Sequence, residues 1–420
     1  MPQIHALDAL EILDSRGRPT LHVTCTLGDG AHGAASVPSG ASTGAAEAHE
    51  LRDGDPARYR GLGCLQAAAH VRETIFNALS GSDFSDQAAL DSALIALDGT
   101  ANKSRLGANA ILGVSLAFAR ACAAAQRRPL WAYFAALAGE APRLPRLTIN
   151  LFSGGKHAGG QVSIQDVLIV PLAATIRGAL EQAAAVYQAA AVLIRDRYHM
   201  RPLTADEGGL APDFETDQAM LDLAMRAIEA AGFTPGHEIA LAVDVAASHC
   251  YADGLYTLSG GRFDREAMID HLLGWAARYP LISIEDGLAE DDWVGWAALC
   301  ARLPAHTRAL GDDLLCTHPA RIRRAVDLHA ANALLLKLNQ IGTVTEALAG
   351  RALAAAAGWQ VVASARSGET EDHWLADLAV GWRADYLKVG SVTQSERLAK
   401  YNRLLYIEAR ELASAETHKI

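Results

Sequence analysis

The chain has 420 residues, of which 50% are hydrophobic and 20% charged, and its formal net charge is −11. This length exceeds one ordinary core, so two domains are expected, and the apolar content argues against disorder. The acidic balance argues against nucleic acid or an anionic membrane as partner. The six cysteines include no C-x-x-C pair, no uncharged apolar stretch reaches membrane-spanning length, and a signal peptide is not recognisable. We therefore expect a cytoplasmic protein.

The first third of the chain has strands followed by helices. Strands are expected over 9–13, 20–27 and 34–37, separated by turn signals. Apolar residues at helical spacing then predict helices over 64–79, 108–125 and 130–137. Such an order is typical of an α+β domain. We expect this domain to span residues 1–138, with its boundary in the proline-containing stretch that follows.

The remainder of the chain, residues 139–420, alternates between strands and helices. Strand-like runs over 147–151 and 167–170 precede a long helix over 173–197. Each later helix is followed by an apolar strand-like run, and these helices are 217–231, 265–278, 293–303, 319–329, 344–357 and 371–382. The dinucleotide-binding pattern G-x-G-x-x-G does not follow the first strand, which argues against an open nucleotide-binding sheet. The alternation therefore predicts a closed parallel α/β barrel.

Three acidic residues stand directly after apolar runs of the predicted barrel: Asp244, Glu285 and Asp312. The carboxyl ends of parallel strands meet around one mouth, so these side chains should converge. A single such acid is more often a surface carboxylate or a helix N-cap, and the neighbouring Asp286 and Asp313 look like caps. Three acids at the ends of successive predicted strands are less easily explained as surface carboxylates or helix caps. Carboxylate oxygens suit Mg²⁺, and a metal site is predicted.

Two lysines lie in apolar strand-like runs. Lys337 ends the run Leu-Leu-Leu, and Lys388 lies in Tyr-Leu-Lys-Val-Gly. A lysine on a buried strand is rarely tolerated unless it is paired, and burial lowers its pKa toward that of a useful base. The alternative is a salt-bridged structural lysine. Together with Arg366, the two lysines could attract an anionic substrate to an otherwise acidic protein.

Glycine-rich loops carry three further candidates. Glu207 in Asp-Glu-Gly-Gly is a candidate general acid or base, although it could be an ordinary turn residue. His157 lies between two pairs of glycines, and its alternative is a solvated loop histidine. The segment 39–44, which contains Ser42, is typical of a mobile lid that offers hydroxyls and amides to a phosphate or a metal.

Taken in order, these motifs resemble the enolase family, the glycolytic 2-phosphoglycerate dehydratases, over almost the whole chain. The segments that carry the resemblance are 11–17, 37–44, 97–100, 106–116, 206–209, 244–248, 283–286, 311–314, 336–342, 367–372 and 395–402. The resemblance implies an α/β protein with an N-terminal α+β capping domain and a C-terminal modified (β/α)8 barrel of the enolase type. It also implies a homodimer or a higher homo-oligomer and a small anionic phospho-carboxylate substrate.

The resemblance further implies a role for each matched residue. Asp244, Glu285 and Asp312 would hold a first Mg²⁺, and Ser42 would help hold a second Mg²⁺ whose site the substrate completes. Lys337 would be the base that removes the proton next to the substrate carboxylate. Other residues would contact the substrate. Lys388 would stabilise the enolate, and Glu207 would protonate the departing hydroxide. Arg366 and Ser367 would bind the phosphate, and the remaining substrate-binding residues would be Ser364, His157 and Asp166.

Two positions depart from the family pattern. Asp166 follows Gln165 where enolases have Gln-Glu, and Ala365 stands where they have His in Ser-His-Arg-Ser. Asp is shorter than Glu by about 1.5 Å, and alanine removes a donor and an acceptor. Three hypotheses follow. The first is an enolase that interconverts 2-phosphoglycerate and phosphoenolpyruvate. The second is a specialised paralogue, such as the carboxyphosphonoenolpyruvate synthase of phosphonate biosynthesis, and the third is a non-catalytic binding protein on an enolase scaffold.

Overall fold

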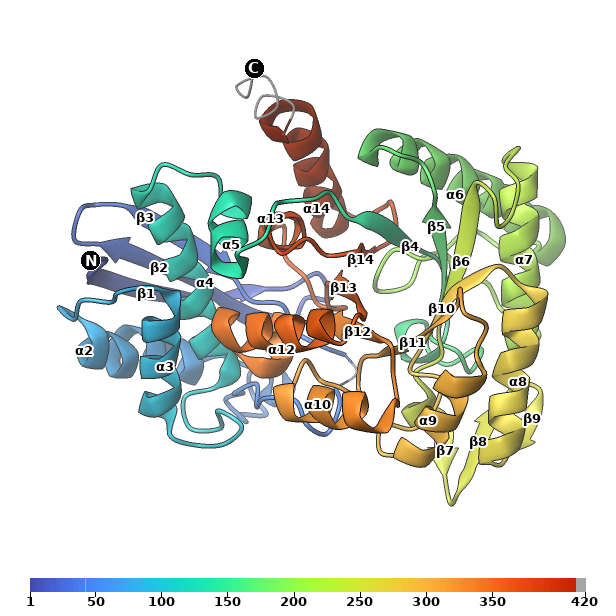
Figure 1. The fold of residues 1–420 in the computed structure, drawn as a ribbon, viewed down its shortest axis with the longest axis horizontal. Helices are drawn as coiled ribbons and strands as arrows, with labels where there is room; N and C mark the ends of the chain where they lie inside the picture. Colours follow the sequence, from blue (N-terminus) through green and yellow to red (C-terminus); the bar gives the residue numbers. More distant parts are fainter. Residues whose placement is uncertain (42, 413–420) are drawn as a thin grey trace.

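The computed structural model describes residues 1–41 and 43–412. Figure 1 shows the N-terminal part, in blue and teal, lying against one side of a larger barrel in green to red. The fold class predicted from the sequence is confirmed, because a separate small sheet with helices precedes a closed barrel of eight strands. The predicted division after residue 138 falls directly after helix α5 and stays a prediction.

The N-terminal sheet is antiparallel, with β1 (Ile4–Leu13), β2 (Pro19–Leu27) and β3 (His32–Ser36) in that order. Its buried face packs against helix α4 (Ala108–Ala125). Gly33 permits this close approach, because a Cβ there would lie 2.2 Å from the carbonyl oxygen of a residue in α4. By length and composition α4 could cross a membrane, but 83% of it is buried inside the fold, as in a core helix.

Two features of the N-terminal helices differ from expectation. The predicted helix 64–79 contains a π-helical stretch, η2 (His70–Ile75), in its middle. A helix over 87–98 was not predicted, although Asp86 caps it by accepting a hydrogen bond from the amide of Ala89 at 2.8 Å. The remaining elements of this part are η1 (Tyr59–Gly61), α1 (Leu65–Ala69), α2 (Phe76–Leu79), α3 (Gln87–Asp98) and α5 (Leu130–Ala138).

The barrel closes in the order β10-β11-β12-β13-β14-β4-β5-β6. The expectation of an all-parallel barrel is wrong at one strand, since β5 runs antiparallel to both of its neighbours, β4 and β6. The barrel strands are β4 (Arg146–Ser153), β5 (Asp166–Pro171), β6 (Ile239–Asp244), β10 (Leu281–Glu285), β11 (Arg308–Gly311), β12 (Ala333–Leu336), β13 (Gln360–Ser364) and β14 (Tyr386–Gly390).

Most barrel helices lie where the sequence places them. The predicted helix 371–382 begins later, at Trp374, because Asp372 instead accepts a hydrogen bond from the amide of Ser36 at 2.8 Å. The last long helix and a small hairpin sheet were not predicted. The helices are α6 (Ile176–Tyr198), α7 (Asp217–Ala230), α8 (Arg265–Arg278), α9 (Trp293–Arg302), α10 (Pro319–Leu328), α11 (Leu338–Ile341), α12 (Val344–Ala356), α13 (Trp374–Gly381) and α14 (Ser395–Tyr406). Shorter elements are η3 (Gly155–His157), η4 (Ala247–Cys250), β7 (Tyr251–Ala252), β8 (Leu255–Leu258), β9 (Gly261–Phe263) and η5 (Ile407–Leu412).

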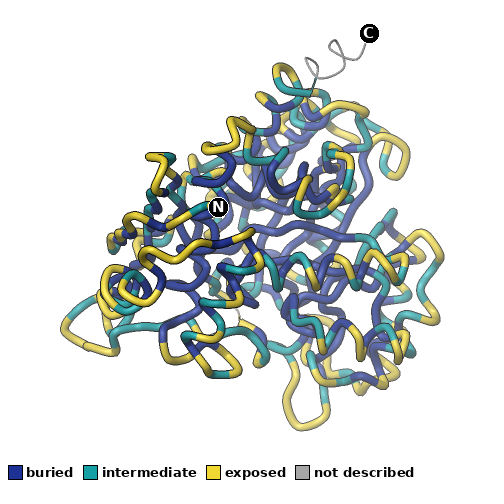
Figure 2. The backbone as a smooth tube through the Cα atoms, turned by 60° about the vertical axis from the view of Figure 1, so that its left-hand side comes forward, coloured by how far each residue is buried: buried dark blue, intermediate teal, exposed yellow. Residues whose placement is uncertain are grey.

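Apolar side chains form two buried clusters. The larger one fills the space between the strands and the surrounding helices of both parts of the chain. The smaller one lies on alternate residues of the barrel strands, including Leu168, Ala242 and Leu335. Figure 2 shows the buried segments running through the centre and the exposed ones at the periphery. Polar side chains at the strand ends are therefore held on a rigid, well-packed frame.

Candidate active site

Three neighbouring barrel strands place acidic side chains in one row. Glu285 is the register partner of Asp244, and Asp244 is the register partner of Asp166. Asp244 and Glu285 end their strands, whereas Asp166 begins β5. Because β5 runs in the opposite direction, its first residue reaches the same mouth that its neighbours reach with their last. All three residues are at least 97% buried.

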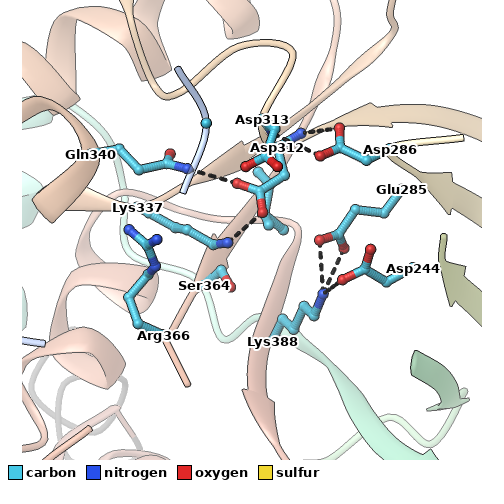
Figure 3. A network of polar contacts seen from close by, with 12 residues as sticks. Asp244, Glu285, Asp286, Asp312, Asp313, Lys337, Gln340, Ser364, Arg366 and Lys388 are labelled. Atoms are coloured by element: carbon cyan, nitrogen blue, oxygen red, sulfur yellow. Dashed lines mark hydrogen bonds and ion pairs between the residues drawn. The ribbon is translucent and has the colours of Figure 1, made fainter. Parts of the chain in front are cut away.

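The amine of Lys388 bridges two of these carboxylates (Figure 3). Its Nζ lies 3.0 Å from Asp244 Oδ2 and 2.8 Å from both oxygens of Glu285. Burial disfavours the charge of Lys388, but Asp244 and Glu285 outweigh this effect and hold its pKa well above the ordinary value. Burial also disfavours the charge of Asp244, yet Lys388 lowers the pKa of this acid to about 2. Burial and the charge of Asp244 raise the pKa of Glu285. The single positive charge of Lys388 thus does not balance the two carboxylates of Asp244 and Glu285.

Lys337 and Asp312 form a second ion pair in the same mouth. Asp312 Oδ1 also accepts a hydrogen bond from Gln340 Nε2 at 2.8 Å. The expectation that burial lowers the pKa of Lys337 is wrong. Burial does act in that direction, but the carboxylate of Asp312 outweighs it, and the pKa is raised. In this arrangement the pKa of Lys337 favours the protonated amine.

Asp286 and Asp313 do not cap helices, contrary to the prediction. The Asp286 carboxylate accepts hydrogen bonds from the backbone amides of Asp312, at 3.0 Å, and of Asp313, at 2.8 Å. The N-cap of α9 is Asp292, whose side chain accepts a hydrogen bond from the amide of Gly295, and the N-cap of α10 is His318, whose side chain accepts one from the amide of Ala320. Asp286 therefore fixes the backbone that presents Asp312 to the mouth.

The acids at the mouth fit a divalent cation. Asp244, Glu285 and Asp312 offer three buried carboxylates, while Lys337 and Lys388 supply two positive charges. Oxygen donors on rigid strand ends suit Mg²⁺, whose charge would offset the burial of the Glu285 carboxylate and its repulsion by Asp244. The ligand atoms of Asp312 lie within 4.8 Å of those of Asp286 and Asp313, but Asp286 is already engaged by two amides.

His157 and Asp166 form a buried pair beside the carboxylate row. His157 Nδ1 lies 2.9 Å from Asp166 Oδ2, and Ser153 Oγ donates to Asp166 Oδ1 at 2.6 Å. Burial disfavours the imidazolium, but Asp166 and Glu207 outweigh it and raise the pKa of His157 to about 9. The predicted loop histidine is therefore neither exposed nor neutral. Because Asp166 is held on both oxygens, its shorter side chain is fully engaged by this chain's own residues.

Glu207 lies on the other side of His157. Its Oε1 is 3.8 Å from His157 Nε2, and its Oε2 accepts a hydrogen bond from Asn150 Nδ2 at 3.0 Å. Burial would raise the pKa of Glu207, but the charges of His157 and Arg397 lower it. Glu207 is therefore ionised at neutral pH in this arrangement. The role of Glu207 as the acid, which the resemblance implies, stays a prediction.

The cationic side of the mouth is built from the segment after β13. The Arg366 guanidinium is 97% buried and meets the carboxylate of Glu47, while Asn339 Oδ1 accepts from its Nη1 at 2.8 Å. Ser367 Oγ accepts from Arg16 Nη1 at 3.0 Å. The guanidinium thus lies close to the mouth on a segment that both domains contact.

Two predicted residues contribute differently. Ser364 ends β13 opposite Lys388, and its hydroxyl donates to the carbonyl of Ala365 at 2.9 Å. Ala365 itself is 7% exposed, so the position where the family has histidine is buried in this chain. Ser42, predicted as a ligand of a second metal, lies outside the described residues.

Sequence reasoning missed several polar residues of the site. Asn150 could have been found, because it is a polar residue inside the buried apolar strand β4. Gln340 follows Lys337 closely in sequence, but its contact with Asp312 depends on the fold. Glu47 and Arg16 have no local signal, since each reaches the barrel from the N-terminal domain.

Family models were matched over nearly the whole chain. The model described as Enolase, N-terminal domain, matches residues 4–134. The model described as Enolase, C-terminal TIM barrel domain, matches residues 142–419. Every residue of the mouth named above, except Glu47 and Arg16, lies in the second match.

Proposed function

Since this chain belongs to the enolase family and is thereby a lyase of that superfamily, we propose that it catalyses the reversible dehydration of 2-phosphoglycerate to phosphoenolpyruvate. One observation carries the proposal. At a single barrel mouth, the amine of Lys337 is paired with Asp312, while Lys388 bridges Asp244 and Glu285. A base, a fixed cation and three carboxylates suited to metal are what proton removal beside a carboxylate requires.

We propose that Asp244, Glu285 and Asp312 hold Mg²⁺, and that Ser42 helps hold a second ion. Bound there, the metal would neutralise Asp312 and the substrate carboxylate, which makes the adjacent C–H more acidic. With Asp312 engaged by the metal, the ammonium of Lys337 would lose its proton to solvent, and the neutral amine would then accept the proton from the carbon next to the carboxylate. Lys388 remains charged and faces the negative charge that develops on the carboxylate oxygens.

The departing hydroxide leaves on the side of His157 and Glu207. His157 holds a proton 3.8 Å from Glu207 Oε1, so the pair can protonate the leaving group and release water. Asp166 and Ser153 keep the imidazole in this orientation. Arg366 and Ser367 are proposed to bind the phosphate. The carbon–oxygen bond breaks as the C–H electrons form the new double bond, so the atoms of 2-phosphoglycerate equal those of phosphoenolpyruvate and water.

The test is the absorbance of phosphoenolpyruvate after 2-phosphoglycerate and Mg²⁺ are added to the purified chain. We expect a rise that a chelator abolishes and that excess Mg²⁺ restores. Lys337→Met should remove the rise, and its Tm is measured alongside, because the change also leaves the buried carboxylate of Asp312 without its ion-pair partner. A clean preparation that forms no phosphoenolpyruvate with Mg²⁺ would contradict the proposal.

A second candidate is a paralogue that acts on a related phospho- or phosphono-carboxylate, like carboxyphosphonoenolpyruvate synthase. Two observations favour it: Asp166 is shorter than the family's Glu, and Ala365 carries no polar group in a buried position beside Arg366. The double variant Asp166→Glu with Ala365→His separates the candidates. A large gain in dehydration of 2-phosphoglycerate would indicate a diverged site. No gain over an already fast wild-type enzyme would leave dehydration as the function.

We also propose a cytoplasmic homo-oligomer whose substrate is a small phospho-carboxylate. The exposed leucines Leu10 and Leu13 on β1, 56% and 54% exposed, support self-association. Mass measurement in solution at several concentrations tests the oligomer. A monomer at micromolar concentration would contradict it.

A further inference from the structure

The loop after β3 contacts the segment after β13 at both of its ends, through backbone hydrogen bonds at one end and an ion pair at the other. At its first end, Ser39 and Gly368 exchange two backbone hydrogen bonds of 2.8 and 2.9 Å. At its far end, the carboxylate of Glu47 meets the guanidinium of Arg366. Both sets of contacts involve residues 366–368, beside the phosphate site proposed above.

The contact between Glu47 and Arg366 is bidentate. Nη1 donates to Oε2 and Nη2 donates to Oε1, each at 3.1 Å, and the two side chains are 8% and 3% exposed. Asn339 Oδ1 accepts from the same Nη1 at 2.8 Å. A planar guanidinium held by a fork of two parallel hydrogen bonds cannot rotate about its long side chain. Glu47 therefore fixes the plane of Arg366.

Glu47 is also connected to the metal-binding side of the mouth. Its Oε1 accepts hydrogen bonds from the backbone amide of Gly44 at 3.1 Å and from Gln340 Nε2 at 3.4 Å. The same Gln340 amide donates to Asp312 Oδ1 at 2.8 Å. One buried carboxylate thus joins the loop, the guanidinium and the neighbour of a proposed metal ligand. An ordinary surface glutamate makes no such set of contacts.

We propose that Glu47 is a positioning residue that orients Arg366 toward a phosphoryl group and holds the backbone of the loop after β3 at Gly44. The inference rests on the proposed function, because it takes Arg366 as the anion-binding residue. A carboxylate that orients the guanidinium also neutralises part of its positive charge, which weakens its attraction for an anion. The geometry compensates for this cost, since an oriented fork loses less conformational entropy when an anion binds.

The first test uses inorganic phosphate as the probe, in the presence of Mg²⁺ and without turnover. Glu47→Gln keeps the shape of the side chain but loses its charge. We expect it to bind phosphate about tenfold more weakly than the wild-type chain, as for the loss of one charge-assisted hydrogen bond. Amide exchange of residues 43–48 should become faster. Asp55→Asn is the control, because Asp55 is an exposed acid farther along the same segment whose Oδ1 accepts a local hydrogen bond from the amide of Ala57 at 2.9 Å, and its phosphate affinity should stay within about twofold of wild type.

Turnover separates positioning from a merely structural role. With 2-phosphoglycerate, Glu47→Gln should raise KM by about tenfold and change kcat much less, because the interaction acts on binding of the phosphate. If Glu47→Gln does not fold, Glu47→Asp serves instead. It keeps the charge on a side chain about 1.5 Å shorter, so an intermediate loss of phosphate affinity is expected.

Three results would overturn the inference. Tighter phosphate binding by Glu47→Gln would mean that Glu47 competes with the anion for Arg366. Unchanged binding with a lower Tm would reduce Glu47 to a structural residue, and failure of the wild-type chain to bind phosphate would remove the anion site. A wild-type chain that binds phosphate but forms no phosphoenolpyruvate would instead contradict the proposed function and leave the role of Glu47 standing.

Discussion

Asp166 and Asp244 are register partners across an antiparallel strand pair, although Asp166 begins its strand and Asp244 ends its own. The reversal of β5 brings the acid that pairs with His157 next to an acid that pairs with Lys388. The side of the mouth proposed for the leaving group and the side proposed for the metal are therefore adjacent. In an all-parallel barrel, the first residue of β5 would lie at the opposite end.

Replacing Lys388 by methionine should destabilise the fold. The substitution leaves Asp244 and Glu285 buried without their amine, and breaking a buried pair costs about 3–5 kcal/mol. Mg²⁺ should restore part of this loss, because it supplies the missing positive charge. Urea unfolding with and without Mg²⁺ measures both effects. Equal destabilisation in both conditions would argue against a metal at these carboxylates.

Replacing Lys337 by alanine should abolish proton removal. General bases contribute about 10²–10⁴-fold, so loss of at least about 10² in kcat is expected. Exchange of the substrate's C2 proton with deuterated solvent, followed by NMR, reports the step directly. The control is Lys156→Met, which removes an exposed lysine near the mouth. Undiminished exchange in Lys337→Ala would show that another group is the base.

Stability should fall at alkaline pH through His157. Its pKa is raised to about 9 in the fold against an ordinary value of 6.5, so its charge contributes about 3 kcal/mol to stability. Because the folded value is the higher one, this contribution is complete below pH 6.5 and disappears as the pH rises through 9. Urea unfolding of wild type and of His157→Gln between pH 6 and 10 isolates the effect as the difference in slope. Parallel curves would contradict a paired, charged His157.

Asp286→Ala should weaken both the fold and the metal site. The change leaves the amides of Asp312 and Asp313 without the acceptor they have at 3.0 and 2.8 Å. Each buried unsatisfied donor costs about 1–3 kcal/mol, so the loss of the acceptor for both amides is expected to cost about 2–6 kcal/mol. Mg²⁺ affinity by calorimetry should also fall, because Asp312 is no longer held. Asp291→Ala, on an acid whose side chain is 70% exposed, should change neither quantity; equal effects of both variants would refute the role of Asp286.

Some parts of the site could be predicted from local patterns. Asp244 and Glu285 each follow a short apolar run, and the structure places each at the end of a buried strand. Their meeting at one mouth needed only the rule that parallel strand ends converge. The pKa of Lys337 could not be predicted in the same way, because it depends on the distance to Asp312 and not on burial alone.

The sequence by itself determined the family, the barrel and the residue types available for chemistry, because periodicity and motifs are local properties of the chain. Only the tertiary structure decided which of these groups hold protons, which direction β5 takes and which N-terminal residues reach the mouth. Glu47 and Arg366 lie far apart in sequence, yet the effect of burial on the Arg366 guanidinium is outweighed by the carboxylate of Glu47, which raises the pKa of that guanidinium. Electrostatic energy in a buried site depends on distances of a few ångströms, and folding alone sets those distances.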